Sequence, residues 1–254
     1  MPRKTMARQS DSYTNLADIY DLLTKDSDIQ GFYRAWRDSL LKAVRRYGLE
    51  VHTLVDLACG TGNTAIPWTE RGWTVVGVDR STAMLRVARS RSRRVRWICQ
   101  DITQLHLKQQ ADLVTCHFDA LNHVLAPEKL QRVFINVARI LKKGGLFQFD
   151  LNTDHWLKWL AAHEKLFPKG QHFMVAHNEY DRKSGIATFH QLWFLRKGSL
   201  YAKREVSVQE RAYNAAAIRD MVQSAGMRLV EATVQKRLEG RPIRMLYVAR
   251  KPGA

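Results

Sequence analysis

Short apolar segments alternate with amphipathic segments through the first 152 residues. Five apolar runs rich in β-branched residues are expected to be strands, at residues 53–58, 73–78, 95–99, 113–118 and 146–151. Between them, apolar residues return at helical spacing, most clearly over residues 127–141, and Gly144 and Gly145 are expected to end that helix. Continuous apolar strands that alternate with helices predict an α/β fold with a doubly wound, mostly parallel sheet.

The pattern changes after the fifth run. Three extended segments separated by turn signals follow, at residues 172–181, 186–196 and 199–213. Their close spacing without helices favours an antiparallel β insertion after the fifth strand. A helix near 214–225 and strands near 228–235 and 243–250 would complete a Rossmann-like, seven-stranded sheet. Ahead of the first strand, residues 14–25 and 28–47 have the spacing of amphipathic helices.

Composition and charge narrow the function classes. Hydrophobic residues make up 45% of the 254 residues and charged residues 26%, as in a globular protein. The formal net charge is +17, and six arginines fall between Arg86 and Arg96. The remaining basic residues are scattered, which favours a solvated surface over a nucleic-acid site, although RNA or a phosphorylated substrate stays open.

Two features that the sequence lacks bear on where the protein is located and on whether it binds a metal. No run of 18 apolar residues could span a membrane, and the basic N-terminal residues lack the apolar stretch of a secretion signal, so we expect a soluble, cytoplasmic protein without a membrane partner. Cys59, Cys99 and Cys116 form no CxxC pair. We therefore expect reduced thiols and no metal site.

A glycine-rich loop follows the first predicted strand. Residues 60–65 match G-x-G-x-x-A, where glycine lets the backbone approach a ligand and the helix N-terminus attracts an anionic group. Asp79 ends the second strand, where it could accept both ribose hydroxyls of a nucleoside, and Asp101 follows the third. A nicotinamide dinucleotide remains an alternative, because Arg80 could meet a 2′-phosphate, but Asp56 four residues before Gly60 disfavours it.

These segments resemble the class I S-adenosylmethionine-dependent methyltransferases. LVDLACGTGNTA is similar to their first motif, VVGVDRSTAML to the second, CQDI to their adenine contact, and LKKGGLFQFDLN to the motif at the fifth strand. The resemblance implies S-adenosyl-L-methionine as the cofactor. It assigns the methionine part of the cofactor to Ala58, Gly60 and Gly62, the ribose to Asp79, and the adenine to Met84, Asp101 and Ile102.

Two further segments resemble particular branches of that family. YRAW and HFDALNHV look like the glycine N-methyltransferases and the amino-sugar N,N-dimethyltransferases, which also carry an antiparallel insertion. This resemblance implies that Tyr20, Tyr33 and Trp36 fold over the cofactor from the N-terminal helices, and that His117 lies beside it. Core packing is the alternative role for the three aromatic residues.

The residues expected to carry the chemistry follow the fourth strand. His123 could accept a proton near neutral pH, and it coincides with a histidine of the related N-methyltransferases; a packed or helix-capping imidazole is the alternative. Tyr13 and Tyr20 are alternative catalytic residues. Asp119, which could bind an ammonium group or cap the following turn, and Asn122 are candidate substrate residues.

Two other regions could contact the acceptor. Arg241 and Arg244 flank a proline before the last strand and could bind a carboxylate or diphosphate, or simply be solvated. Polar and aromatic residues of the insertion could cover the acceptor pocket: His172, His177, Tyr180, His190 and Trp193.

The sequence thus predicts four parts: an N-terminal helical cover (1–50), a cofactor-binding core (51–152), an inserted antiparallel lid (153–213) and a C-terminal completion of the core sheet (214–254). We expect an enzyme that transfers a methyl group to nitrogen, or to oxygen, of a small molecule. The alternatives are a tRNA or rRNA methyltransferase and a non-catalytic, cofactor-binding partner subunit.

Overall fold

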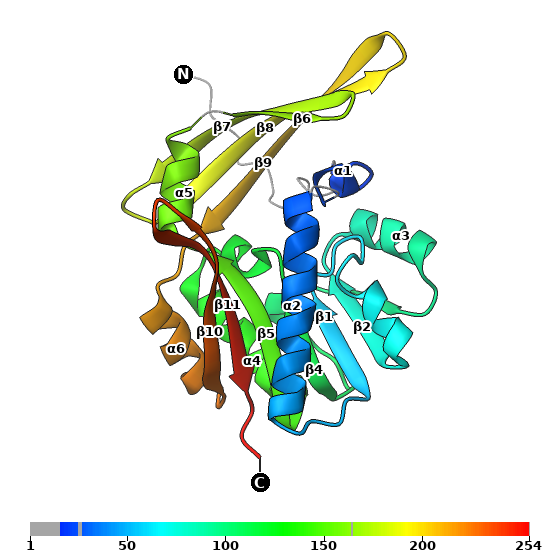
Figure 1. The fold of residues 1–254 in the computed structure, drawn as a ribbon, viewed down its shortest axis with the longest axis vertical. Coiled ribbons are helices and arrows are strands. Elements are labelled where there is room, and N and C mark those ends of the chain that lie inside the picture. Colours follow the sequence, from blue (N-terminus) through cyan, green and yellow to red (C-terminus); the bar gives the residue numbers. More distant parts are fainter. Residues whose placement is uncertain (1–15, 25–26, 164, 254) are drawn as a thin grey trace.

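The computed structural model describes residues 16–24, 27–163 and 165–253. A seven-stranded sheet with the order β10-β11-β5-β4-β1-β2-β3 forms the centre of the protein (Figure 1). Strands β1 to β5 run parallel, and β10 and β11 pair antiparallel at one edge. The strands are β1 (Thr53–Leu57), β2 (Thr74–Asp79), β3 (Arg96–Cys99), β4 (Ala111–Cys116), β5 (Leu141–Asn152), β10 (Arg228–Leu238) and β11 (Arg241–Arg250). The predicted α/β fold class is confirmed.

Helices cover both faces of this sheet. On one face, Leu54 of β1 packs with Leu40 of α2 (Ser27–Arg46) and Leu85 of α3 (Thr82–Arg91), together with the 3₁₀ helix η1 (Ile66–Arg71). On the other face, Val55 packs with side chains of α4 (Pro127–Ile140) and α6 (Ala215–Ser224). Neighbouring residues of β1 thus enter opposite cores, which is why the strand is apolar throughout.

A second sheet lies over the end of the molecule at which α1 (Tyr20–Thr24) is found (Figure 1). It is antiparallel with the order β6-β7-β8-β9, and α5 packs beside it. Its apolar core includes Trp193 and Met174, and Leu16 and Met84 pack into the same cluster. We call this sheet the lid; its elements are α5 (Asp154–Ala161), β6 (Lys165–Lys169), β7 (His172–Asp181), β8 (Ile186–Lys197) and β9 (Leu200–Arg211).

One local expectation was wrong, and two short elements were missed. Helix α4 ends at Ile140, close to the predicted end, but Gly144 and Gly145 do not end it, because they lie inside β5, which begins at Leu141. A Cβ atom on Gly145 would lie 2.9 Å from the carbonyl oxygen of Asp112, so glycine is needed there for the close approach of β4. The short elements α5 and β6 were not predicted at all.

The N-terminal cover is less helical than predicted. Within residues 16–24, only Tyr20–Thr24 is α-helical, and the preceding residues form turns in which Leu16 and Ile19 are buried. The candidate residue Tyr13 lies outside the described residues.

In the part of the chain that the structure describes, no helix is both long and apolar enough to cross a membrane.

Candidate functional site

A cavity of about 360 Å³ opens at the carboxyl ends of β1, β2 and β4. Ten of the residues singled out in the sequence line it: Tyr20, Tyr33, Ala58, Gly60, Asp79, Met84, Asp101, Ile102, His117 and His123. The parallel order of the strands explains this convergence, because their carboxyl ends meet at one edge.

The loop after β1 reaches the cavity through a strained backbone. Ala58 has a positive φ of 51°, which is rare for a residue with a side chain, and Gly60 has a φ of 53°. Gly62, expected beside the cofactor, is not among the residues that line the cavity. A Cβ atom on Gly62 would lie 2.6 Å from the Trp97 ring, so this glycine allows the loop to pack on β3.

Asp79 lines the cavity from the end of β2. Its Oδ2 accepts a hydrogen bond from the Gly60 amide at 2.9 Å, and its Oδ1 accepts one from the Ser81 amide at 2.8 Å. Burial raises the pKa of Asp79, and these amides oppose that rise. Two fixed donors therefore orient the carboxylate, while each oxygen keeps a lone pair for a ligand hydroxyl.

Apolar side chains and a second acid lie beside Asp79. Met84 and Ile102 are buried and line the same cavity. Asp101 caps the 3₁₀ turn η2 (Ile102–Gln104), where its Oδ1 accepts a hydrogen bond from the Thr103 amide at 2.8 Å. This part of the cavity offers apolar surface with an acid at its edge.

Helix α1 is bound to the glycine loop by contacts that the sequence did not reveal. Asp21 accepts hydrogen bonds from Thr61 Oγ1 at 2.7 Å, Asn63 Nδ2 at 3.1 Å and Arg91 Nη1 at 3.1 Å. These contacts hold the neighbouring Tyr20 at the cavity. An acid within an amphipathic helix carries no signal of partners that are 40 and 70 residues distant.

Trp36 does not reach the cavity wall, contrary to expectation. It is buried behind His117, with the two rings stacked at a centroid distance of 4.8 Å. His117 itself lines the cavity, and its Nε2 lies 3.0 Å from the side-chain amide of Gln148. Burial lowers the pKa of His117 to about 4, so its imidazole is neutral at neutral pH.

His123 lies on the 3₁₀ turn η3 (Ala120–His123) and lines the cavity. Its Nδ1 is 2.8 Å from the Gln209 carbonyl oxygen of lid strand β9, so Nδ1 carries the proton and donates it to that bond. Its Nε2 faces Asp119, with Oδ2 at 3.9 Å. Burial, the largest influence, lowers the pKa of His123, which favours an imidazole able to accept a proton.

Asp119 does not cap the turn that follows it. Its φ is +52°, and its side chain makes no capping hydrogen bond to η3. It forms an ion pair with Arg244 at 2.6 Å instead. Arg244 also pairs with Asp150, and it lies within β11 with its side chain only 12% exposed. The alternative that this arginine is simply solvated was therefore wrong for Arg244, whereas Arg241 is exposed.

Asn122 is committed to structural hydrogen bonds. It is fully buried, and its Nδ2 donates to the carbonyl oxygens of Asn152 at 3.1 Å and Arg211 at 2.9 Å. Its Oδ1 accepts from the Asn152 amide at 2.9 Å. Asn122 therefore joins β5 to β9 and is not placed to contact an acceptor.

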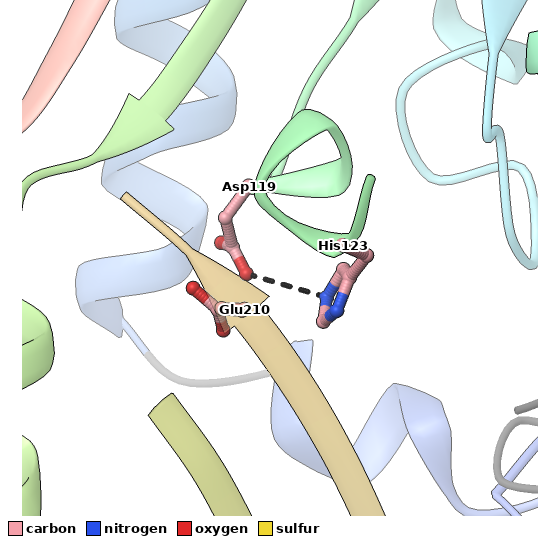
Figure 2. A group of neighbouring side chains, drawn as sticks. All are labelled: Asp119, His123 and Glu210. Carbon is pink, nitrogen blue, oxygen red and sulfur yellow. Dashed lines mark ion pairs between the residues drawn. The ribbon is translucent and has the colours of Figure 1, made fainter. Parts of the chain in front are cut away.

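The lid contributes one acidic residue that the sequence analysis missed. Glu210 of β9 lies beside Asp119 and His123, and one ligand atom from each of the three falls within 4.8 Å of the others (Figure 2). Glu210 could not be recognised from the sequence, because it belongs to a strand whose polar residues alternate as they do on a solvent-exposed surface. Among the residues expected to cover the acceptor, His177 and His190 are exposed and Trp193 is buried in the lid core.

Comparison with known proteins bears on the family of this chain. Residues 54–145 match a family model described as a methyltransferase domain. The crystal structure of an S-adenosylmethionine-dependent methyltransferase from Clostridium acetobutylicum ATCC 824 is similar over 95% of this chain and 99% of that one, with a TM-score of 0.82 and 27% identity. The chain is a class I S-adenosylmethionine-dependent methyltransferase. This finding sets the nicotinamide alternative aside.

Curated proteins that are similar to this methyltransferase have names that state different reactions. A demethylmenaquinone methyltransferase of Thermobifida fusca (strain YX) is 34% identical over 139 residues, which are 52% of this chain and 56% of that protein. A dTDP-3-amino-3,6-dideoxy-alpha-D-glucopyranose N,N-dimethyltransferase of Streptomyces fradiae is 29% identical over 126 residues, or 50% of this chain and 49% of that one.

The cavity of the methyltransferase fits its cofactor. Its volume of 360 Å³ lies within the range of about 300 to 1,000 Å³ that is usual for small-molecule sites. The oriented Asp79 carboxylate suits a pair of ribose hydroxyls, and the apolar surface of Met84 and Ile102 suits a purine ring.

Proposed function

We propose that the methyltransferase transfers a methyl group to an amine nitrogen of a small molecule. The observation that carries this proposal is His123, a partly buried imidazole with Nδ1 bonded to a lid carbonyl, which lines the same cavity as the cofactor residues. When bound, S-adenosylmethionine supplies an electrophilic methyl group on its sulfonium.

The assignments for the cofactor follow the lining of the cavity. Asp79 accepts the ribose hydroxyls, Met84 and Ile102 cover the adenine with Asp101 at its edge, and Ala58 and Gly60 contact the methionine part. Tyr20 and Tyr33 close over the cofactor from α1 and α2. The cavity that would hold the cofactor also includes His123 of η3, so an acceptor bound beside His123 would share that space with the cofactor.

His123 then serves as the proton acceptor for the incoming group. A protonated amine has no lone pair, so it must lose a proton before nitrogen can attack carbon. His123 Nε2 takes that proton, and the Asp119 carboxylate beside it stabilises the imidazolium. Tyr20 lines the cavity as an alternative orienting group. The named activity of the Streptomyces fradiae relative on an amino sugar supports nitrogen; oxygen is the second candidate atom, since His123 could equally accept a hydroxyl proton.

The test is a screen with labelled methyl groups on amines, nucleotide-linked amino sugars and tRNA. With the best acceptor, we expect His123→Ala to lower the rate of methyl transfer about a hundredfold or more without changing cofactor affinity, because the lost group acts only on the acceptor proton. His190→Ala, on the exposed side of the lid, is the matched control. Full turnover by His123→Ala would contradict the assigned role.

A further inference from the structure

Arg244 joins several parts of the molecule beside the cavity. It lies on β11, and its guanidinium pairs with Asp119, which follows β4, and with Asp150 of β5. The same guanidinium lies over two aromatic rings, 5.2 Å from the centre of Phe32 of α2 and 5.5 Å from that of Phe118. Among the described residues, those that line the cavity do not include Arg244. Its contacts in the structure are therefore with protein groups.

The turn that Arg244 contacts has an unfavourable backbone. Phe118 and Asp119 connect β4 to η3, and their φ values are +63° and +52°. Of the described non-glycine residues with a positive φ, these two form the only adjacent pair. A bulky residue such as Phe118 is rarely found in this conformation. Strain of this kind persists only where the surrounding structure holds the chain in place.

Arg244 takes part in each side-chain contact that holds this turn. Its Nη2 pairs with Asp119 Oδ1 at 2.6 Å, and its guanidinium lies over the Phe118 ring. Its Nη1 pairs with Asp150 Oδ2, and the same oxygen accepts a hydrogen bond from the Asp119 amide at 3.2 Å. Asp119 is thus held through its side chain by Arg244 and through its backbone by an acid that Arg244 binds.

This arrangement needs the shape of an arginine as well as its charge. Burial raises the pKa of Asp150 to about 6 and Arg244 opposes that rise, so Asp150 is ionised at neutral pH. A planar guanidinium can donate to two carboxylates at once and lie flat on a ring, whereas an ammonium group is a single point charge. Lysine at this position would therefore retain the charge but could not make the same set of contacts.

The turn leads directly into the residue assigned to proton transfer. Helix η3 begins at Ala120, immediately after Asp119, and ends at His123. Asp119 Oδ2 lies 3.9 Å from His123 Nε2 (Figure 2). The other ring nitrogen, Nδ1, is 2.8 Å from the Gln209 carbonyl oxygen of the lid. The lid and the turn thus place the imidazole from two sides.

We propose that Arg244 is a positioning residue, which fixes the strained Phe118–Asp119 turn and thereby the location of His123 in the cavity. This proposal rests on the proposed function of His123 and adds the residue that holds it in place. Group transfer depends steeply on the placement of the reacting groups, and a displacement of about 1 Å can cost about a hundredfold in rate. Loss of the arginine contacts should therefore slow methyl transfer, although Arg244 is not part of the cavity wall.

The first test measures turnover with the acceptor found in the screen above. We expect Arg244→Lys to lower kcat about ten- to a hundredfold, with the affinity for S-adenosylhomocysteine near the wild-type value. In a His123→Ala background the same substitution should have no further effect, because a residue that acts through His123 cannot slow a reaction that no longer uses it.

Arg250→Lys is the matched control for this test. Arg250 lies on the same strand, and its guanidinium also lies over a ring, 4.7 Å from the centre of Tyr47. Its turnover should equal that of the wild type.

The second test requires no acceptor. NMR of protein with ¹⁵N-labelled histidine rings follows His123, whose signals are assigned by their loss in His123→Ala. We expect these signals to shift or broaden in Arg244→Lys but not in Arg250→Lys, and those of His52, which precedes β1, to stay in place in both. Urea unfolding checks that each variant is folded. If Arg244→Lys does not fold, Arg244→Gln combined with Asp150→Asn, which removes one charge of each sign, is measured in the same way.

Unchanged His123 signals in a folded Arg244 variant would overturn the proposal. An equal loss of rate with and without His123, or a loss of cofactor affinity that parallels the loss of rate, would also overturn it, since Arg244 would then support the site as a whole. Full turnover by His123→Ala would instead contradict the proposed function. The NMR signals would still decide whether Arg244 places the His123 ring.

Discussion

Single side chains of this enzyme owe their protonation states to burial, and His117 is the clearest case. It lines the cavity and stacks on Trp36, and burial is the main cause of its lowered pKa. Its imidazole therefore presents a neutral surface to the cavity. His123, only six residues further on, is neutral for the same reason but faces two carboxyl groups, so it can accept and hold a proton.

The burial of His117 predicts how stability depends on pH. Its pKa is about 4 in the folded state and 6.5 in the unfolded state, so its stabilising contribution is present above pH 6.5 and is lost as the pH falls towards 4. Between pH 7.5 and pH 4.5, the stability advantage of wild type over His117→Gln should shrink by about 2 to 3 kcal/mol. Urea unfolding at both pH values measures this, and the other titrating groups cancel in the difference. A constant difference would mean that His117 is solvated.

Asp79 carries the second prediction at this scale. Asp79→Asn retains an acceptor for one backbone amide but loses the charge that strengthens hydrogen bonds from ribose hydroxyls. We expect the affinity for S-adenosylhomocysteine to fall about ten- to a hundredfold, the equivalent of about 1.5 to 3 kcal/mol. Calorimetry checks this, with Asp154→Asn on the lid as a control. Unchanged affinity in a folded variant would remove Asp79 from the cofactor site.

Sequence alone identified those residues whose position follows from the end of a strand. Asp79 and Asp101 could be placed at the sheet edge because the apolar runs before them are unambiguous. Asp21 and Glu210 could not be identified from the sequence, because the residues that they contact are brought close to them only by folding. Arg244 was underestimated for the same reason, because its two acidic partners are 94 and 125 residues away.

Among the elements, the long apolar strands and helix α4 were predicted well, while short elements with mixed composition were missed. Strand β6 contains Pro168 and two lysines, and α5 has only eight residues, so neither has a strong periodic signal. Gly144 and Gly145 were misleading because glycine can mark either the end of a helix or a close approach of two strands. Here the close approach of strand β4 is the reason for a glycine at position 145.

The junction between the glycine loop and β3 yields an element-scale prediction. Gly62→Ala would combine a positive φ with a collision at 2.6 Å, whereas Gly72, with a similar φ of 76°, has nothing within 4 Å of an added Cβ. We expect Gly72→Ala to cost about 1 kcal/mol and Gly62→Ala at least about 2 kcal/mol more. In a Trp97→Leu background, the excess cost of Gly62→Ala should largely disappear. Chemical unfolding of the four variants measures the coupling, and an undiminished cost would refute the ring contact.

At the scale of the whole molecule, the lid, α1 and the core sheet meet around one cavity. The lid packs on residues 16–19 and on α3 through an apolar cluster, and it supplies Gln209 and Glu210 to the acceptor side. The order of the parts along the chain, and a cover and a lid over the site, could be predicted, but the side chains that close these parts around the site could not. That closure depends on side chains whose partners are in other parts of the fold.

The net charge of +17 raises the question whether the methyl acceptor is a small molecule or an RNA. All six arginines between Arg86 and Arg96 are exposed, on α3 and the entry to β3, and Arg91 is already bonded to Asp21 and Thr61. A surface of this kind binds RNA by releasing counterions, so its affinity should fall by orders of magnitude between about 50 and 200 mM salt. Methylation of a small amine should change little over that range, since it does not depend on many phosphate contacts.

We therefore expect weak binding of tRNA that is lost at 200 mM salt, as measured by fluorescence anisotropy at several salt concentrations. Substituting Arg93 and Arg94 with Gln should lower the slope of log affinity against log salt by about 1 to 2, with amine methylation unchanged. The same substitution at Arg182 and Lys183, in an exposed lid turn, serves as the matched control. Tight binding of one tRNA at 200 mM salt, with methyl groups incorporated into it, would replace the small molecule with RNA as the acceptor, because counterion release alone cannot sustain affinity at that ionic strength.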